Sequence, residues 1–258
     1  MIKLRSVASI IVIYLLFQAG CSNNKEEDKT LLIYSGAGLK KVMGKIGDDY
    51  SKKTDTKIKF IYSGSGILIN QIKMTKKGDL FIPGDSSFID ELKDIDGKNY
   101  IISEENVAYH KPVLVVSKFE KDKVKTFDDL GKDNINIALG DENTCIGKLS
   151  KKMINKTDLK EAINKNVKVT FGTVNQVALA VSLGEAEAGI AWYSNYVEYK
   201  DKLSLVEIPE EINIIEEISI SVLELSEDKS EAVKFMEFVI NNGVDEFKNN
   251  GYELIEKK

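Results

Sequence analysis

Cysteine and histidine are scarce in this chain of 258 residues, which has two cysteines and one histidine. Cys21 closes an N-terminal leader, so Cys145 has no second cysteine in the remaining chain with which to form an intrachain disulfide. His110 is the single histidine, which excludes a multi-histidine metal site. Without a cysteine cluster, zinc, iron and copper chemistry is not expected either. We therefore expect no metal centre and no cofactor.

The N-terminal apolar run is too short to span a bilayer. It covers Val7 to Phe17 and follows the basic residues Lys3 and Arg5. A positive segment followed by an apolar run of this length is typical of a secretory signal peptide. We predict that residues 1–20 are such a signal peptide.

The residues after this run resemble the lipobox of bacterial lipoproteins. Ala19 and Gly20 precede Cys21, although Gln18 stands where the lipobox usually has Leu. The resemblance implies that Cys21 is acylated and holds the protein at a membrane surface. A free thiol beside an ordinary cleavage site is the alternative. Residues 21–29 are strongly charged and lack large apolar side chains, so we expect a flexible tether.

Basic residues are fewer than acidic ones, 36 against 41, which gives a formal net charge of −5. Removal of a leader with two basic residues and no acid takes this charge to −7. Such a chain is a poor candidate for nucleic-acid binding. Its overall field also repels anions, so an anion site would have to consist of local dipoles rather than a basic patch.

Apolar runs alternate with amphipathic patterns along the chain, which predicts an α/β fold with mainly parallel sheets. The run at 113–116 is continuously apolar and predicts a buried parallel strand. The expected strands are 31–34, 58–62, 80–82, 113–116, 135–139, 167–171, 188–192 and 214–223. The expected helices start near 39, 67, 88, 147, 175 and 230.

Gly- and Ser-rich turns connect strands to helices at 35–38 and 63–66, and similar turns lie at 144–147 and 172–174. Small residues let the backbone approach a ligand, and the free N–H groups of a helix's first turn favour anions. Two of these segments resemble nucleotide-binding motifs but do not match them. The GxG at 36–38 lacks its third glycine, and the P-loop-like segment at 140–148 has the wrong spacing.

The sequence gives only weak indications of a catalytic site. Ser65 lies between glycines, but a nucleophile elbow requires glycine at position 63, which is serine. His110 is the one available imidazole and precedes an expected crossover between two lobes. Asp79 and Asp85 could form an acid/base pair, although carboxylates of loops and helix caps are the favoured interpretation.

Six segments of the chain carry a resemblance to a known family. They are LIYSGAGLKKVM at 32–43, YSGSGILINQI at 62–72, GDLFIPGDSSFIDEL at 78–92, IALGDENTCIGK at 137–148, TVNQVALAVSLGEAEAGIAW at 173–192 and FKNNGYELI at 247–255. In this order and spacing they resemble the molybdate-binding proteins of ABC transporters, within the periplasmic-binding-protein superfamily of two-lobed oxyanion binders.

The resemblance implies a set of ligand-binding residues. They are Gly38, Ser65, Ile146, Val174 and Trp192, with Ser35, Cys145 and Tyr193 as secondary candidates. The family has serine where this chain has Gly38, and tyrosine where it has Trp192. None of these residues is Lys or Arg, so we expect a site of neutral donors without acceptors. Such a site would reject protonated anions.

The implied function is that of an extracytoplasmic lipoprotein that captures molybdate or tungstate and delivers it to an ABC permease. It would be a monomer and not an enzyme, at the outer face of the cell membrane. Lobe one would comprise residues 30–110 and 216–258, and lobe two residues 111–215. The alternatives are a binding protein for sulfate, phosphate or an organic acid, a secreted hydrolase that uses Ser65, and a surface adhesin with a vestigial pocket.

Overall fold

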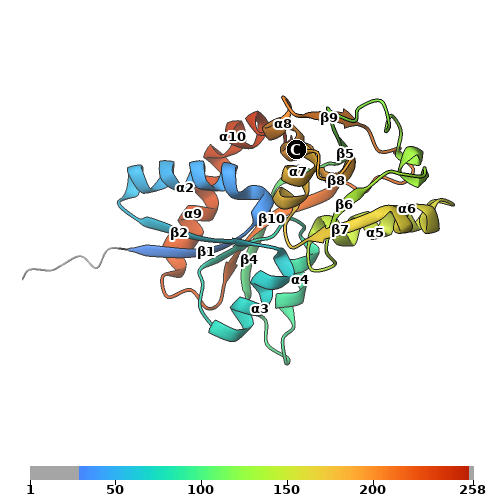
Figure 1. Cartoon of the computed structure of the whole chain (residues 1–258). Coiled ribbons are helices and arrows are strands. Elements are labelled where there is room, and N and C mark those ends of the chain that lie inside the picture. Colours follow the sequence, from blue (N-terminus) through green and yellow to red (C-terminus); the bar gives the residue numbers. More distant parts are fainter. Residues whose placement is uncertain (1–28, 256–258) are drawn as a thin grey trace, which may run out of the picture.

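The computed structural model describes residues 29–255, which form two α/β lobes joined side by side (Figure 1). The predicted signal peptide, Cys21 and nearly all of the predicted tether lie outside the described residues. Within residues 29–255, no helix is both long enough and apolar enough to cross a membrane.

The first lobe is built on a six-stranded sheet with the order β11-β4-β10-β3-β1-β2. Its strands are β1 (Thr30–Gly36), β2 (Lys57–Ser63), β3 (Leu80–Ile82), β4 (Ile101–His110), β10 (Glu216–Leu223) and β11 (Glu253–Leu254). Its helices are η2 (Ala37–Leu39), α2 (Lys40–Thr54), α3 (Ser65–Thr75), α4 (Ser87–Lys93), α9 (Lys229–Asn242) and α10 (Val244–Asn249).

The second lobe is built on a five-stranded sheet with the order β7-β6-β8-β5-β9. Its strands are β5 (Pro112–Ser117), β6 (Ile137–Gly140), β7 (Val167–Phe171), β8 (Ala188–Trp192) and β9 (Leu203–Val206). Its helices are η3 (Phe127–Gly131), α5 (Cys145–Asn155), α6 (Lys160–Asn166), α7 (Val174–Leu183) and α8 (Tyr193–Tyr199).

The predicted two-lobed α/β fold is confirmed, but the sheets are mixed rather than mainly parallel. Strand β1 is parallel to β2 and β3, whereas β10 runs antiparallel to β3 and β4. The expectation of a parallel strand at 113–116 is wrong, because β5 is antiparallel to both β8 and β9. All six residues of β5 are buried. A continuous apolar run therefore reports burial of both faces and not the direction of the neighbouring strands.

Two helices of the second lobe begin earlier than predicted. Thr144 is the N-cap of α5, and its hydroxyl accepts the Gly147 N–H at 3.0 Å. A threonine cap of this kind fixes the helix start directly after itself. The first turn of α5 therefore contains Cys145 and Ile146, which the sequence analysis placed in a loop. Thr173 caps α7 in the same way.

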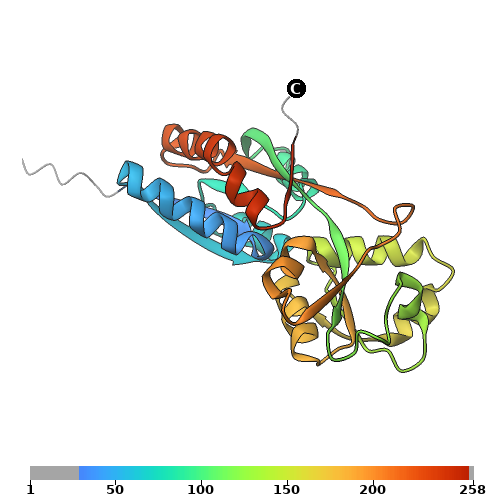
Figure 2. The ribbon, with the colours of Figure 1, turned by 90° about the horizontal axis from the view of Figure 1, so that it is seen from above.

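The chain crosses between the lobes twice (Figure 2). Strand β4 of the first sheet leads through Lys111 directly into β5 of the second, and the segment 207–215 returns from β9 to β10. Strand β4 was not predicted, because its sequence IISEENVAYH has no apolar alternation, and its middle residues are exposed or half-buried.

The lobes are in direct contact. One buried hydrophobic cluster contains residues of both, among them Leu68 of α3 and Leu149 of α5. The Gly66 N–H donates to the Asn143 carbonyl across the interface at 3.2 Å. A second cluster belongs to the first lobe alone. The interface brings the turns that precede α2, α3, α5 and α7 together.

Candidate functional site

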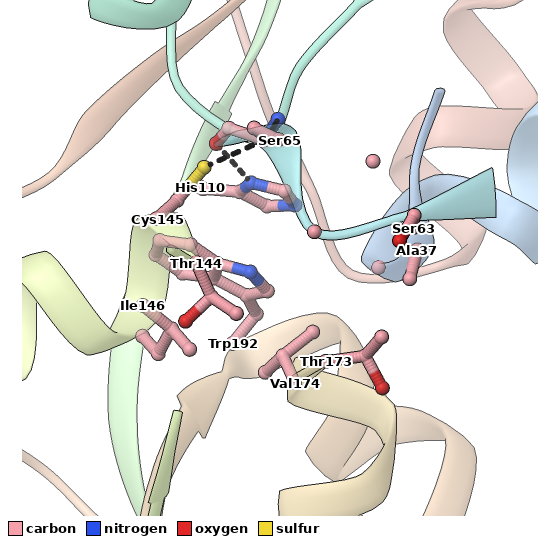
Figure 3. A pocket seen from close by; sticks show the side chains of 14 residues that line it. Ala37, Ser63, Ser65, His110, Thr144, Cys145, Ile146, Thr173, Val174 and Trp192 are labelled. Carbon is pink, nitrogen blue, oxygen red and sulfur yellow. Dashed lines mark hydrogen bonds between the residues drawn. The ribbon is translucent and has the colours of Figure 1, made fainter. Parts of the chain in front are cut away.

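A small cavity of about 30 Å³ lies where these turns meet (Figure 3). The first lobe contributes Gly36, Ala37, Gly38, Ser63, Gly64, Ser65, Gly84 and His110 to its lining, and the second contributes Thr144, Cys145, Ile146, Thr173, Val174 and Trp192. About 10–15 Å³ is needed to hold one water molecule. The cavity therefore has room for a few atoms and not for a sugar or a peptide.

The structure brings the five principal predicted residues together. Gly38, Ser65, Ile146, Val174 and Trp192 all line the cavity. Of the secondary candidates, Cys145 lines it as well.

The other two secondary candidates lie elsewhere. Ser35 is fully buried, with its hydroxyl 3.5 Å from the Gly36 carbonyl, and it is not part of the lining. Tyr193 packs against Tyr196 with ring centroids 5.8 Å apart, and it does not line the cavity either.

Helix starts from both lobes present backbone N–H groups to this cavity. The first N–H groups of a helix have no partner within the helix. In α5 the Thr144 cap takes the Gly147 N–H, which leaves those of Cys145 and Ile146. In α7 the Thr173 hydroxyl accepts the Gln176 N–H at 3.4 Å.

The Thr173 cap leaves the N–H groups of Val174 and Asn175 at the start of α7. Helix α3 begins at Ser65, after the N-cap Gly64. These three helix starts face one space, and their dipoles favour a negative charge there.

Charged side chains are absent from the lining, which among the described residues contains no Lys, Arg, Asp or Glu. The Cys145 thiol lies 3.2 Å from the Ser65 hydroxyl of the other lobe. Burial, with the nearby Asp85 carboxylate as a smaller cause, raises the pKa of this thiol to about 12. The thiol is therefore neutral near pH 7, and it adds no negative charge to the cavity.

His110 lines the cavity, although the sequence analysis considered it only as a catalytic base. Its Nδ1 lies 2.9 Å from the Gly84 carbonyl, and its ring stacks on Trp192 with centroids 4.3 Å apart. Burial lowers the pKa of His110 to about 4, so the ring is neutral near pH 7. Nε2 of a neutral ring bonded in this way is an acceptor. The expectation of a site without acceptors is therefore wrong at this residue.

The chain matches a known family over nearly its whole described length. Residues 31–253 fit the family described as bacterial extracellular solute-binding protein. The chain belongs to this family.

Individual relatives agree with this assignment. A Haemophilus influenzae protein described as a binding protein is 27% identical over 252 residues, which is 97% of this chain and 98% of the relative. The substrate-binding domain of a molybdenum ABC transporter from Clostridium difficile is 28% identical, with a TM-score of 0.66 over 88% of this chain and 99% of that one.

The fold recurs at lower identity. The periplasmic molybdate-binding protein of Azotobacter vinelandii is 16% identical, with a TM-score of 0.76 over 88% of this chain and 100% of that one. The family and its structural neighbours are binding proteins of transporters and not enzymes.

In the solute-binding protein the three residues considered as catalytic groups, Ser65, Asp79 and Asp85, have structural hydrogen-bond partners. The Ser65 hydroxyl accepts the Gly84 N–H at 3.2 Å and meets the Cys145 thiol, and among the described residues it has no imidazole partner. Asp79 accepts hydrogen bonds from the Leu32 N–H and the Ser226 hydroxyl, at 2.7 and 2.6 Å. Asp85 accepts the Ser87 N–H at 2.7 Å. Both carboxylates therefore hold turns in place.

Gly38 and Trp192, the two positions where the resemblance implies serine and tyrosine, face each other across the lobes of the solute-binding protein. A Cβ atom added at Gly38 would lie 3.2 Å from Cδ1 of Trp192 and 3.2 Å from Cγ1 of Val174. Contacts this short require the neighbours to shift. The indole of Trp192 therefore fits because position 38 has no side chain, and the two residues compensate each other in size.

A relay of two asparagines joins the lobes beside the cavity. The Asn175 side chain donates to the Ala37 carbonyl at 2.9 Å, and Asn195 donates to Asn175 at 3.0 Å. Asn195 also accepts the Trp192 N–H at 3.3 Å. Sequence analysis missed this relay, because no spacing links residues 37, 175 and 195.

The fit between Gly38 and Trp192 predicts a coupling. Gly38→Ser should lower the free energy of unfolding by about 1–3 kcal/mol, because it overpacks the site. In a Trp192→Tyr background the same substitution should cost less, by at least about 0.5 kcal/mol. Urea unfolding of the wild type, the two single variants and the double variant measures the difference. Additive effects would contradict the compensation.

The neutral, buried His110 predicts a pH dependence. Because its folded pKa is about 4 and its ordinary value is 6.5, the unfolded chain binds the extra proton between these values. Stability contributed by His110 is thus lost as the pH falls from 6.5 towards 4, by up to about 1.4 kcal/mol per pH unit. His110→Gln should remove this loss in urea unfolding.

Glu216 changes the stability with pH in the opposite direction, so the pH dependence of the wild type must be compared with that of His110→Gln. Burial and Asp85 raise its folded pKa from 4.5 to about 7, so its contribution is lost as the pH rises through this range. Both proteins contain Glu216, and its effect cancels in their difference. An equal pH dependence of the two proteins between pH 5 and pH 7 would contradict a neutral His110.

Proposed function

We propose that this solute-binding protein captures a tetrahedral oxyanion, molybdate or tungstate, and delivers it to an ABC permease. The observation that carries the proposal is the convergence of helix starts from both lobes on one small cavity without charged side chains. Amides at helix starts bind anions through local dipoles. This arrangement suits a chain whose overall charge is negative.

The hydrogen bonds available to such an anion can be compared with the binding free energy that a nanomolar affinity requires. Charge-assisted hydrogen bonds contribute about 1.5–3 kcal/mol each. The N–H groups of Ile146 and Val174, the Ser65 hydroxyl and the Trp192 indole N–H are the proposed donors, together with the amide of Gly38. Five such bonds contribute about 7.5–15 kcal/mol, a range that includes the roughly 12 kcal/mol of nanomolar binding.

Two comparisons support the choice of metal oxyanion. The Clostridium difficile structure is described as the substrate-binding domain of a molybdenum ABC transporter, and the Azotobacter vinelandii protein as molybdate-binding. The cavity of about 30 Å³ also suits a five-atom ion better than an organic acid. Sites for drug-sized ligands occupy about 300–1,000 Å³.

Sulfate or phosphate is the second candidate ligand, and two observations favour it. Trp192 lines the cavity where the resemblance implies the smaller tyrosine, and the bulkier indole favours a smaller anion. The sulfate-binding protein SubI of Mycobacterium tuberculosis shares the fold, with a TM-score of 0.75 at 14% identity over 88% of both chains. All of these anions have the same shape and differ in size and protonation.

Closure of the lobes around the anion is part of the proposal. The boundaries predicted above, with lobe one at 30–110 and 216–258 and lobe two at 111–215, place hinges at the two crossovers. Bonds across the interface, from Asn175 to Ala37 and from Gly66 to Asn143, would form only on closure. The closed form is then the one that the permease recognises.

Anion titration tests the ligand. Molybdate or tungstate should raise the melting temperature of residues 30–258 and bind with micromolar or tighter affinity in calorimetry. Ser65→Ala should weaken binding by about tenfold to hundredfold, because one charge-assisted bond is lost. Ser182→Ala is the matched control, since its buried hydroxyl donates to the Leu179 carbonyl at 2.8 Å, at the far end of α7. A folded protein that responds to no tetrahedral anion would contradict the proposal.

The membrane anchor has its own test. We propose that Cys21 is acylated after removal of residues 1–20, so that the monomer is held at the outer face of the cell membrane. The full chain expressed in a bacterium should partition into detergent and take up labelled fatty acid, and Cys21→Ser should abolish both. Equal partitioning of the two proteins would exclude the anchor.

A further inference from the structure

His110 is the last residue of β4, directly before the chain crosses to the second lobe. The Gly84 carbonyl can only accept, so the hydrogen bond of 2.9 Å between it and Nδ1 requires the proton on Nδ1. In the neutral ring Nε2 then carries a lone pair. The protein backbone therefore selects the tautomer.

Nε2 faces the cavity and has no partner of its own. His110 is 1% exposed, and its Nε2 is buried without a hydrogen bond to any residue of the described chain. Figure 3 shows the ring above Trp192, with one nitrogen bonded and the other on the cavity side. Trp192 and Tyr252, with ring centroids 4.3 and 5.0 Å from that of His110, hold the ring in this orientation. An unsatisfied buried nitrogen is costly, and it is explained if a ligand completes its bonding.

The groups around the His110 ring provide no negative charge in contact with it that would stabilise the protonated imidazole. Cys145 and Tyr252 are neutral, because burial raises the pKa of each. Glu216 lies opposite His110 in the β10–β4 pair, and Asp85 follows Gly84. Lys111, the next residue, pairs with Glu207 at 3.0 Å. Within residues 29–255, no carboxylate hydrogen-bonds to the imidazole, so only a bound anion would stabilise a proton on Nε2.

We propose that His110 contacts the anion directly, and that binding of a fully ionised dianion takes up one proton from solvent, held between Nε2 and an anion oxygen. This rests on the proposed function. The step breaks no covalent bond other than that of the proton to its buffer base. It replaces a repulsive contact between a lone pair and an anion by a charge-assisted hydrogen bond. It also halves the net charge that must be buried.

Proton uptake distinguishes two classes of anion. Molybdate, tungstate and sulfate carry no proton near neutral pH, so each should bring one proton into the complex. Hydrogen phosphate carries its own proton and can donate it to the neutral Nε2, so its binding should take up none. The protonation state of the ligand, and not its charge alone, then decides how affinity varies with pH.

Calorimetric titration with molybdate, tungstate and sulfate, in two buffers with different heats of ionisation, tests this inference. The difference in heat should correspond to about one proton taken up near pH 8. The dissociation constant should rise about tenfold per pH unit between about pH 7 and pH 9. His110→Gln, which keeps a neutral side-chain donor, should bind without proton uptake and with an affinity independent of pH.

Glu216→Gln is the matched control, because Glu216 lies opposite His110 in the β10–β4 pair and its pKa is raised to about 7. It should retain the uptake of one proton. Binding without uptake in the wild type, or uptake that disappears with Glu216→Gln and persists with His110→Gln, would overturn the role of His110. Absence of binding by every anion would instead contradict the proposed function and this inference with it.

Discussion

The site depends on an arrangement of backbone dipoles. Helices α3, α5 and α7 begin at the same cavity, and they come from both lobes. A helix start attracts negative charge without a charged side chain. The chain is acidic overall, so an anion must be stabilised by groups a few ångströms away rather than by the field of the whole protein. The threonine caps of α5 and α7 satisfy the third N–H of each helix and leave the first two for a ligand.

The side chains that complete the site are fitted to one another. Trp192 stacks on His110 and fills the space that the missing side chain of Gly38 provides. His110 is in turn fixed by the Gly84 carbonyl, and the Gly84 N–H donates to Ser65. A change at position 38 or 192 therefore affects the imidazole and the serine as well.

Much of this arrangement could be predicted from the sequence. The Gly- and Ser-rich turns at 35–38 and 63–66 mark strand-to-helix connections whose backbone can approach a ligand. The choice of Ser65, Ile146 and Val174 came from the resemblance to the molybdate-binding proteins, and all three residues line the cavity. His110 was missed as a residue of the cavity lining because a lone histidine carries no local signal. Its position depends on pairing between β4 and β10, strands that are about a hundred residues apart. The strand directions were also mispredicted, since a buried run such as β5 has the same composition in either direction.

Tungsten scatters X-rays anomalously, so a crystal structure of residues 30–258 grown with tungstate is the most direct test of the central claim. The account predicts one strong anomalous peak between the lobes, from a tungstate whose oxygens lie within hydrogen-bonding distance of the backbone N–H groups of Ile146 and Val174 and of the Ser65 hydroxyl. A peak at lysine side chains on the surface, with the cavity between the lobes unchanged, would contradict it.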